Sequence, residues 1–307
     1  MQKIVSNKTT QPTYIDYNNN IQHIIMTRKK KTYRKKILFL LHVIIRHFIK
    51  IDRQHTNKPY IYDHIGAAIF AVFDGHGGGE CSKYLQENFM YHVMNQQEQS
   101  TKNSWYKAVK NGIAEAEERY CKQARRVGDD SGACLITCVL SEDSYIVAGV
   151  GDCRCIAGIG WNKRNKKVIA LSTDHTAKVE STRIRRAGGR VLHGRLDGIL
   201  EPSRTIGDLD VKDKGNTGLI ATPEMRKGKI EQDKLYVFVL ASDGLWDVFK
   251  NHEVISFIHR AIENKKTGNP CKQTAESKNI ADQLVAEASR RGSRDDITAI
   301  VCIVWLP

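Results

Sequence analysis

The sequence predicts a single α+β domain in which antiparallel strands are flanked by helices. Short apolar runs recur along the chain, and their length is typical of buried strands. Amphipathic helical patterns separate several of these runs. Between residues 133 and 171 the strand-like runs follow one another after short connections, which favours antiparallel pairing over parallel crossovers.

The chain is organised around the stretch from Ala67 to Gly79, where seven apolar residues are followed by Asp74, Gly75 and His76. An unbroken apolar run of this kind predicts a strand buried on both faces. The glycines permit a turn and leave room for a close approach to the backbone. A buried carboxylate without a partner is costly, so Asp74 is expected to meet a cation; a capping turn aspartate is the structural alternative.

Aspartates stand at the ends of three further strand-like runs. Asp152 and Asp243 each follow an apolar run. Asp295 and Asp296 directly precede the last apolar run of the chain. Together with Asp74 they predict one oxygen-rich pocket, whose carboxylates suit hard cations such as Mg²⁺ or Mn²⁺.

The spacing of apolar residues also predicts the helices. Helical faces occur within residues 80–95, 105–120, 254–262 and 280–288. Residues 194–210 are rich in turn formers and are expected to be irregular. No linker or shift in composition follows residue 60, so these elements are expected to form one domain.

The net charge of +14 is concentrated near the amino terminus. Residues 1–58 hold 13 of the 48 Lys and Arg residues and only 2 of the 34 Asp and Glu residues. The remainder is close to neutral, which disfavours a nucleic-acid-binding core. Residues 28–36 contain seven basic residues in nine, which fits a nuclear localisation signal, a patch for an anionic surface or a solvated tail.

Composition divides the chain into three parts. Residues 1–36 are predicted to be a disordered polar and basic tail. Residues 37–58 contain an apolar run that is well short of the ~20 residues needed to span a bilayer. This segment is therefore expected to be either a degenerate first strand or an interfacial segment. Residues 59–307 form the predicted folded domain. Eight scattered cysteines without zinc-ligand spacing or a secretory signal predict reduced thiols in an intracellular protein, cytoplasmic or nuclear.

Six segments follow one another along the chain: F-A-V-F-D-G-H-G-G, V-A-G-V-G-D-C-R, the stretch from Asp174-His175 to Gly188-Gly189, E-P-S-R-T-I-G-D, A-S-D-G-L-W-D-V-F and G-S-R-D-D-I-T-A-I-V. In this order they resemble the motifs of the metal-dependent (PPM, type 2C) protein serine/threonine phosphatases, and most closely the integrin-linked-kinase-associated branch. The resemblance covers about residues 65–305. It implies a four-layer αββα sandwich of two packed antiparallel β-sheets flanked by helices.

The resemblance implies a hydrolase that removes phosphate from phosphoserine and phosphothreonine with two Mg²⁺ or Mn²⁺ ions. Asp74 would bridge the ions, and Gly75 would offer its carbonyl oxygen to one of them. Asp243 and Asp295 would complete the shell of the other ion. Asp152 would help to hold a weaker third ion, with a structural turn aspartate as the alternative.

The catalytic residues implied by the resemblance are Asp74 and His76. A hydroxide that bridges the metals would attack phosphorus, and His76 would protonate the departing oxygen. A simple turn histidine is the alternative for His76, and a turn aspartate is the alternative for Asp247. The expected partners are phosphoprotein substrates of a monomeric enzyme, with no nucleic acid required. Contact of the basic and apolar amino-terminal segment with a membrane is disfavoured.

One family motif is missing. Relatives carry an Arg followed by a Glu-Asp pair ahead of D-G-H-G-G; the Arg grips the substrate phosphate and the acid binds the second metal. No Glu-Asp pair precedes Asp74 here. Asp52, 22 residues before Asp74, and Arg46 are the candidate replacements. A pseudophosphatase that acts as a binding or regulatory module is therefore the alternative to an active enzyme.

Overall fold

The computed structural model describes residues 24–27, 38–48, 55–62, 67–98, 104–141, 143–160, 166–215, 218–263 and 274–306. Side chains are described from Ala67 onward within these ranges, except those of Glu98 and residues 274–279. The tail predicted for residues 1–36 lies outside these ranges, apart from one four-residue strand. No helix in the described ranges is long and apolar enough to cross a membrane.

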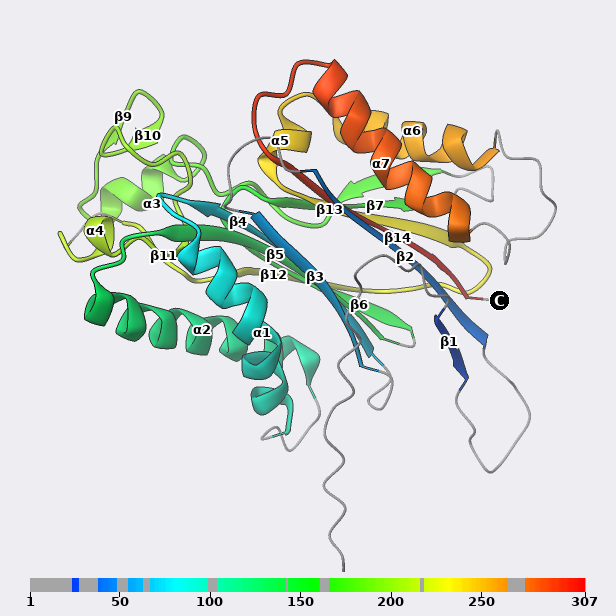
Figure 1. The fold of residues 1–307 in the computed structure, drawn as a ribbon, viewed down its shortest axis with the longest axis horizontal. Helices are drawn as coiled ribbons and strands as arrows, with labels where there is room; N and C mark the ends of the chain where they lie inside the picture. Colours follow the sequence, from blue (N-terminus) through cyan, green and yellow to red (C-terminus); the bar gives the residue numbers. More distant parts are fainter. Residues whose placement is uncertain are drawn as a thin grey trace, which may run out of the picture.

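Two antiparallel sheets form the inner layers of the domain (Figure 1). One has the strand order β1-β2-β14-β13-β7-β8, and the other has the order β12-β6-β5-β4-β3 with the short β11 paired to β5. The first sheet contains β1 (Ile24–Thr27), β2 (Leu38–Phe48), β7 (Arg154–Ile159), β8 (Lys167–Ala170), β13 (Leu235–Ala241) and β14 (Ile297–Trp305). The second contains β3 (His55–Tyr62), β4 (Ala67–His76), β5 (Gly132–Ser141), β6 (Ser144–Val150), β11 (Ile206–Gly207) and β12 (Glu224–Lys229).

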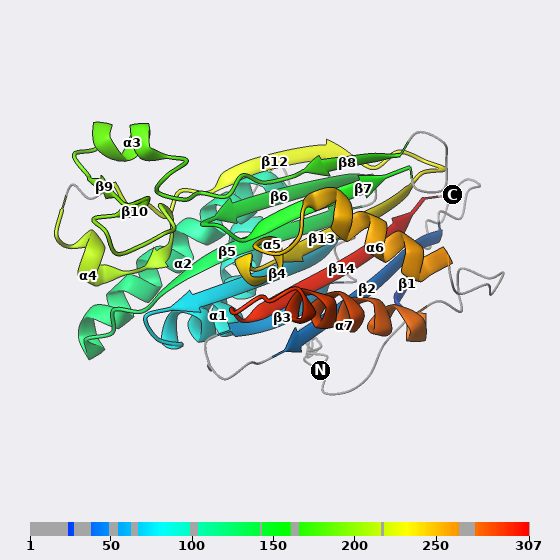
Figure 2. The ribbon, with the colours of Figure 1, turned by 90° about the horizontal axis from the view of Figure 1, so that it is seen from above.

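Helices cover the outer face of each sheet (Figures 1 and 2). The sheet that contains β3, β4, β5 and β6 is covered by α1 (Glu80–Glu98) and α2 (Trp105–Val127), whose apolar faces pack against β4 and β5. The other sheet is covered by α5 (Asp243–Trp246), α6 (Asn251–Glu263) and α7 (Thr274–Arg290). The layers confirm the predicted αββα sandwich, and each predicted helix exists and extends beyond its predicted core.

Strand β4 shows why its apolar run has no polar break. Phe70 and Val72 point into the core between the two sheets. Ile69 and Phe73 point the other way, beneath α1 and α2. Successive side chains of a strand alternate between its faces, so a strand buried on both sides needs an apolar residue at every position. Each of these side chains is at most 1% exposed, and burial of one stabilises the fold by about 1.5–3 kcal/mol.

The short connection between β5 and β6 joins an antiparallel pair, whereas the next connection leads to the other sheet. These two strands pair as an antiparallel hairpin, as predicted. Strand β7, which the sequence analysis missed, then crosses to the other sheet and pairs with β8 and β13. Strand β12 was also missed, because it lies at the edge of its sheet and carries the polar sequence E-M-R-K-G-K. The turn between β6 and β7 thus joins the two sheets at the point where Asp152 lies.

A small unit between β8 and β12 projects from one end of the sandwich (Figure 2). It contains α3 (Ser181–Arg186), β9 (Val191–Leu192), β10 (Arg195–Leu196) and α4 (Leu209–Lys212). A separate cluster around Ile184 and Leu196 forms its core. Glu180 ties it together by accepting hydrogen bonds from Arg183, Ser203 and Arg204. The stretch predicted to be irregular, 194–210, lies largely in this unit.

The amino-terminal strands extend the first sheet. Strand β2 pairs with β14 from Phe48 opposite Ile297 to Leu40 opposite Trp305. Most of the apolar run in residues 37–58 therefore forms a strand, one of the two alternatives for this segment. Strand β1 lies within the predicted tail and pairs with β2.

Candidate active site

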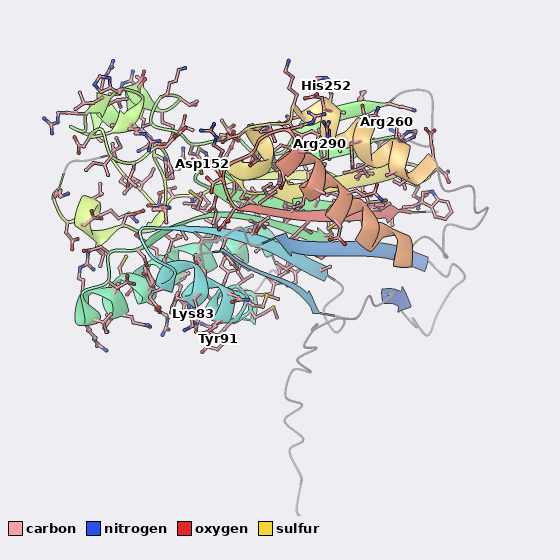
Figure 3. The ribbon with its side chains drawn as sticks, turned by 45° about the horizontal axis from the view of Figure 1, so that its top comes forward. Lys83, Tyr91, Asp152, His252, Arg260 and Arg290 are labelled. Carbon is pink, nitrogen blue, oxygen red and sulfur yellow. The ribbon has the colours of Figure 1, made fainter. Side chains whose placement is uncertain are left out.

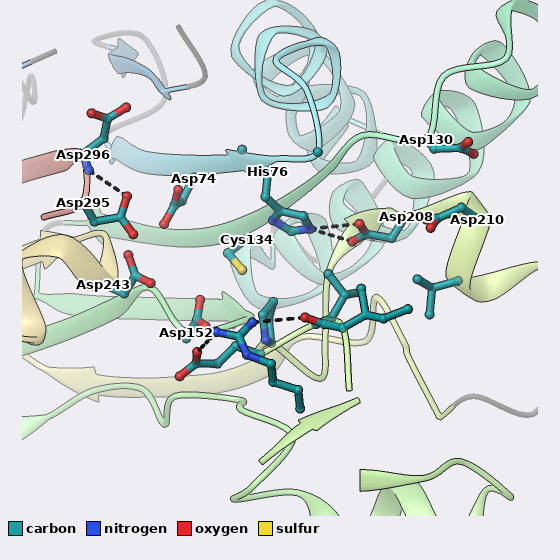
Figure 4. Close-up of a pocket in the computed structure, with 18 of the residues that line it drawn as sticks. Asp74, His76, Asp130, Cys134, Asp152, Asp208, Asp210, Asp243, Asp295 and Asp296 are labelled. Carbon is teal, nitrogen blue, oxygen red and sulfur yellow. Dashed lines mark hydrogen bonds and ion pairs between the residues drawn. The ribbon is translucent and has the colours of Figure 1, made fainter. Parts of the chain in front are cut away.

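A cavity of about 790 Å³ opens where the ends of β4, β6, β13 and β14 meet (Figure 4). Every metal or catalytic residue predicted from the sequence lines it: Asp74, Gly75, His76, Asp152, Asp243 and Asp295. Asp296 also lines the cavity, whereas Asp247 does not. In Figure 3 Asp152 lies at this end of the strands, while Tyr91 projects outward from α1 and is 64% exposed.

Paired turns bring Asp243 beside Asp295. Ser242, which precedes Asp243, donates its backbone N–H to the Thr298 carbonyl at 3.1 Å, and its hydroxyl accepts the Thr298 N–H at 3.0 Å. A Cβ on Gly244 would lie 2.4 Å from the Asp296 carbonyl oxygen, so only glycine permits this approach of the two turns. In Figure 4 the side chains of Asp74, Asp243 and Asp295 face one another.

Asp152 is placed by the tight turn between the sheets. The preceding Gly151 has φ +97°, and a Cβ there would lie 2.3 Å from Cys134 Sγ. Asp152 is 8% exposed, and the Cys134 thiol donates a hydrogen bond to it. Arg154 is fixed just beyond, with its Nε 2.9 Å from Asp174 Oδ1 and its guanidinium 5.0 Å from the Trp246 ring centroid.

The clustered carboxylates destabilise one another's charged forms. Burial, followed by the charges of Asp74, Asp152 and Asp295, raises the pKa of Asp243 to about 9. Burial also raises the pKa of Asp152 to about 6, against the effect of its hydrogen bond from Cys134 and with a further increase from Asp74. Carboxylate oxygens that repel one another are the donor set that a hard divalent cation stabilises, so these residues fit Mg²⁺ or Mn²⁺.

The predicted metal ligands are not spaced as a coordination site among the described residues. The part of the chain that the structure describes contains no group of three or more His, Cys, Asp or Glu side chains already spaced to hold a metal ion. Asp52 lies outside the described residues. Arg46 is opposite Ala299 in the β2–β14 pair, and its side chain is not among those described. The proposed replacement of the missing motif by Asp52 and Arg46 stays a prediction.

His76 has a carboxylate partner that the sequence analysis did not assign. Its Nε2 lies 2.9 Å from both Oδ1 and Oδ2 of Asp208. Burial lowers the pKa of His76, but the hydrogen bond and charge of Asp208, with the charges of Asp74 and Asp152, outweigh burial and raise it. The imidazole is therefore held toward its protonated form, with 29% of its side chain exposed to the cavity side.

Asp208 itself is almost completely buried, at 3% exposure, and has φ 54°. Its backbone N–H donates to the Ser131 carbonyl at 3.2 Å. Its carboxylate lies against Gly132, where an added Cβ would come within 2.1 Å of Oδ2. Asp208 ends the segment E-P-S-R-T-I-G-D, so the family resemblance marked its motif, but nothing in the sequence linked it to a histidine 132 residues earlier.

Other lining residues were also missed. Asp130 and Asp210 extend the acidic wall beyond Asp208 (Figure 4). Arg195 and Glu201 come from the small unit between β8 and β12 and form an ion pair at 2.9 Å. These residues lie in turns and short elements, where apolar periodicity carries no signal.

The match to known proteins covers most of the chain. The family model for protein phosphatase 2C matches residues 47–297. The human integrin-linked kinase-associated serine/threonine phosphatase 2C is 34% identical over 251 residues, which cover 76% of this chain and 61% of that protein. The probable protein phosphatase 2C 59 of Arabidopsis thaliana is 32% identical over 238 residues, which cover 76% and 68%.

The chain spans between about half and two-thirds of the length of such relatives, from 48% to 68%. Solved structures show the same fold. The serine-threonine phosphatase 2C of Toxoplasma gondii aligns with a TM-score of 0.68 at 20% identity, covering 92% of this chain and 98% of its own. A C. elegans sex determining protein aligns with a TM-score of 0.71 at 19% identity, covering 86% and 64%. The chain therefore belongs to the protein phosphatase 2C family of serine/threonine phosphatases.

Proposed function

We propose that this protein is a Mg²⁺- or Mn²⁺-dependent phosphatase that hydrolyses phosphoserine and phosphothreonine in proteins. The observation that carries the proposal is the convergence of Asp74, Asp152, Asp243 and Asp295 with His76 on one cavity in a member of this family. Bound divalent ions would supply Lewis-acid activation of water and neutralise charge on the phosphoryl group.

The carboxylates and one backbone carbonyl hold the metal ions in this proposal. Asp74 would be shared between two ions, and the carbonyl of Gly75 would bind one of them. Asp243 and Asp295 would complete the other site, and Asp152 would contribute to a weaker third one. The raised pKa of Asp243 supports this role, because a cation in the cavity would relieve the repulsion that keeps its proton bound.

His76 supplies the proton in this proposal. The leaving group is a serine or threonine alkoxide, which is a poor leaving group unless it is protonated. Asp208 raises the pKa of His76 and holds its ring through Nε2. Asp208 is accordingly a positioning residue and His76 the general acid.

A cysteine nucleophile is not supported. Cys134 lines the cavity, but it is 2% exposed and burial raises the pKa of its thiol well above the ordinary value, followed by the charge of Asp152. A protonated, buried thiol is a weak nucleophile. The proposed reaction class is metal-assisted hydrolysis without a covalent enzyme intermediate.

A pseudophosphatase is the second candidate, and one observation favours it. No Glu-Asp pair precedes Asp74, where relatives carry the pair that holds the second metal. In that case the cavity would bind phosphoprotein without turnover. The proposal of an intracellular, monomeric protein that acts on phosphoproteins accompanies both candidates; the seven described cysteines, all buried free thiols, support a reducing compartment.

Hydrolysis of a phosphoserine peptide at increasing Mn²⁺, with metal content measured in parallel, tests the proposal. We expect metal-dependent turnover that is lost in Asp243→Asn while the far-UV circular dichroism spectrum is unchanged. Asp233→Asn is the matched control, because Asp233 also lies in a turn next to β13 but does not line the cavity. Phosphopeptide binding without turnover at saturating metal would establish the pseudophosphatase, and full turnover by Asp243→Asn would refute the metal assignment.

A further inference from the structure

The cavity carries far more negative than positive charge. Nine carboxylates line it: Asp74, Asp130, Asp152, Glu201, Asp208, Asp210, Asp243, Asp295 and Asp296. Among the described residues the only Lys or Arg side chains in its lining are Arg195 and Arg294. Two divalent ions would offset only part of this excess. A phosphomonoester is itself an anion, so a free cationic side chain at this cavity would favour its entry.

Most cationic groups near the cavity are already engaged. Arg195 donates to Glu201 Oε2 at 2.9 Å and to the Ile199 carbonyl at 3.1 Å. Arg154 is held by Asp174 and by Asn251, whose Oδ1 lies 2.8 Å from Nη1. The His76 ring is bound to Asp208. None of these groups can turn to a substrate without losing a charge-assisted contact.

Arg294 differs from them. It is exposed, and within the part of the chain that the structure describes no hydrogen bond, ion pair or aromatic ring engages its guanidinium. It immediately precedes Asp295, so its backbone lies next to the proposed metal site. A guanidinium that is solvated and uncommitted keeps its five donors available for an oxyanion.

The backbone that carries Arg294 is fixed on both sides. Ser293 donates its N–H to the Ala288 carbonyl at 3.2 Å and its hydroxyl to the Gly244 carbonyl at 2.7 Å. On the other side the Asp296 N–H donates to Asp295 Oδ1 at 2.7 Å. The Arg294 guanidinium, which has no partner among the described residues, is therefore attached to a rigid backbone, and this lowers the entropy lost when a ligand binds.

We propose that Arg294 binds the phosphoryl oxygens of the substrate at the mouth of the cavity. The inference rests on the proposed function and adds to it a substrate-binding residue. The planar guanidinium can present two parallel N–H donors to two phosphoryl oxygens, which gives both charge and geometric selectivity. Arg294, in the turn before β14, would thereby provide a positive charge that binds phosphate. This role does not depend on the degenerate amino-terminal motif.

The test is direct binding of inorganic phosphate to the full chain at saturating Mg²⁺, by isothermal titration calorimetry. For Arg294→Gln we expect the dissociation constant for phosphate to rise about 10- to 100-fold, the range for loss of a charge-assisted hydrogen-bonding pair. Arg294→Lys should recover part of the affinity, because it keeps the charge but loses the paired donors. Arg126→Gln, an exposed arginine on α2 that lines no part of the cavity, is the matched control and should bind like wild type.

Kinetics separate this proposal from the proposed function. With phosphoserine peptide and with an aryl phosphate, Arg294→Gln should raise KM by a similar factor, because both substrates present the same phosphoryl group. Unchanged phosphate binding, or a loss confined to peptides with an acidic neighbour of the phosphoserine, would overturn the proposal. Wild-type binding of phosphate that depends on Arg294 but without turnover would support it while refuting the enzyme assignment.

Discussion

Replacing Gly132 by Ala is expected to separate His76 from Asp208 without changing either residue. Gly132 on β5 lies opposite His76 of β4 on one side and opposite Gly207 of β11 on the other. A methyl group at this position would lie 2.1 Å from Oδ2 and 2.3 Å from Cγ of Asp208. The Asp208 backbone is held by its bond to Ser131, so the carboxylate has to turn away from His76.

Two magnitudes follow from this geometry. Forcing an extra methyl group into a packed site typically costs about 1–3 kcal/mol, so the free energy of unfolding should fall by that amount. General-acid catalysis is worth ~10²- to 10⁴-fold, and a histidine without its positioning partner should lose at least about 10-fold of it on a phosphoserine peptide. An activated aryl phosphate, whose leaving group needs no proton, should be hydrolysed at a nearly unchanged rate.

Urea denaturation and steady-state kinetics on both substrates measure these effects. A double-mutant cycle with Asp208→Ala tests the cause, since removal of the carboxylate also removes the clash. The double variant should be destabilised by less than the sum of the two single variants. Strict additivity in the cycle, or wild-type turnover of the phosphoserine peptide by Gly132→Ala, would refute the reasoning.

Three further outcomes are expected. His76→Gln should slow hydrolysis of a phosphoserine peptide far more than that of an activated aryl phosphate, and equal slowing would indicate a structural role. Asp52→Asn should abolish a weak second Mn²⁺ site together with activity while the tight site is kept; two equally tight ions in both proteins would contradict this. The raised pKa of Asp243, 3.8 ordinarily and about 9 here, means that the metal-free native state binds more protons than the unfolded chain between these values. Its free energy of unfolding should therefore fall as the pH rises through that window, less so in Asp243→Asn, as measured by thermal denaturation without metal.

Local sequence patterns predicted many of the helices and strands. They reflect the free-energy cost of exposing apolar residues or burying a charge, which is set within a single segment. An apolar run such as Ala67–Phe73 can be satisfied only by burial on both faces, and both faces are buried. The aspartates next to such runs were recognised because a charge beside a buried strand needs a partner. The four carboxylate candidates Asp74, Asp152, Asp243 and Asp295 line one cavity.

Contacts between distant segments were decided only by the tertiary structure. The pairing of His76 with Asp208 depends on β4, β5 and β11 lying side by side, with glycines where any Cβ would block the approach. The sequence alone also does not distinguish Arg154, Arg195 and Arg294, because their side chains are chemically identical. Asp174 engages Arg154 and Glu201 engages Arg195, whereas the guanidinium of Arg294 has no partner among the described residues. Periodicity reports the faces of one element, whereas partners across elements are set by how the sheets and turns pack.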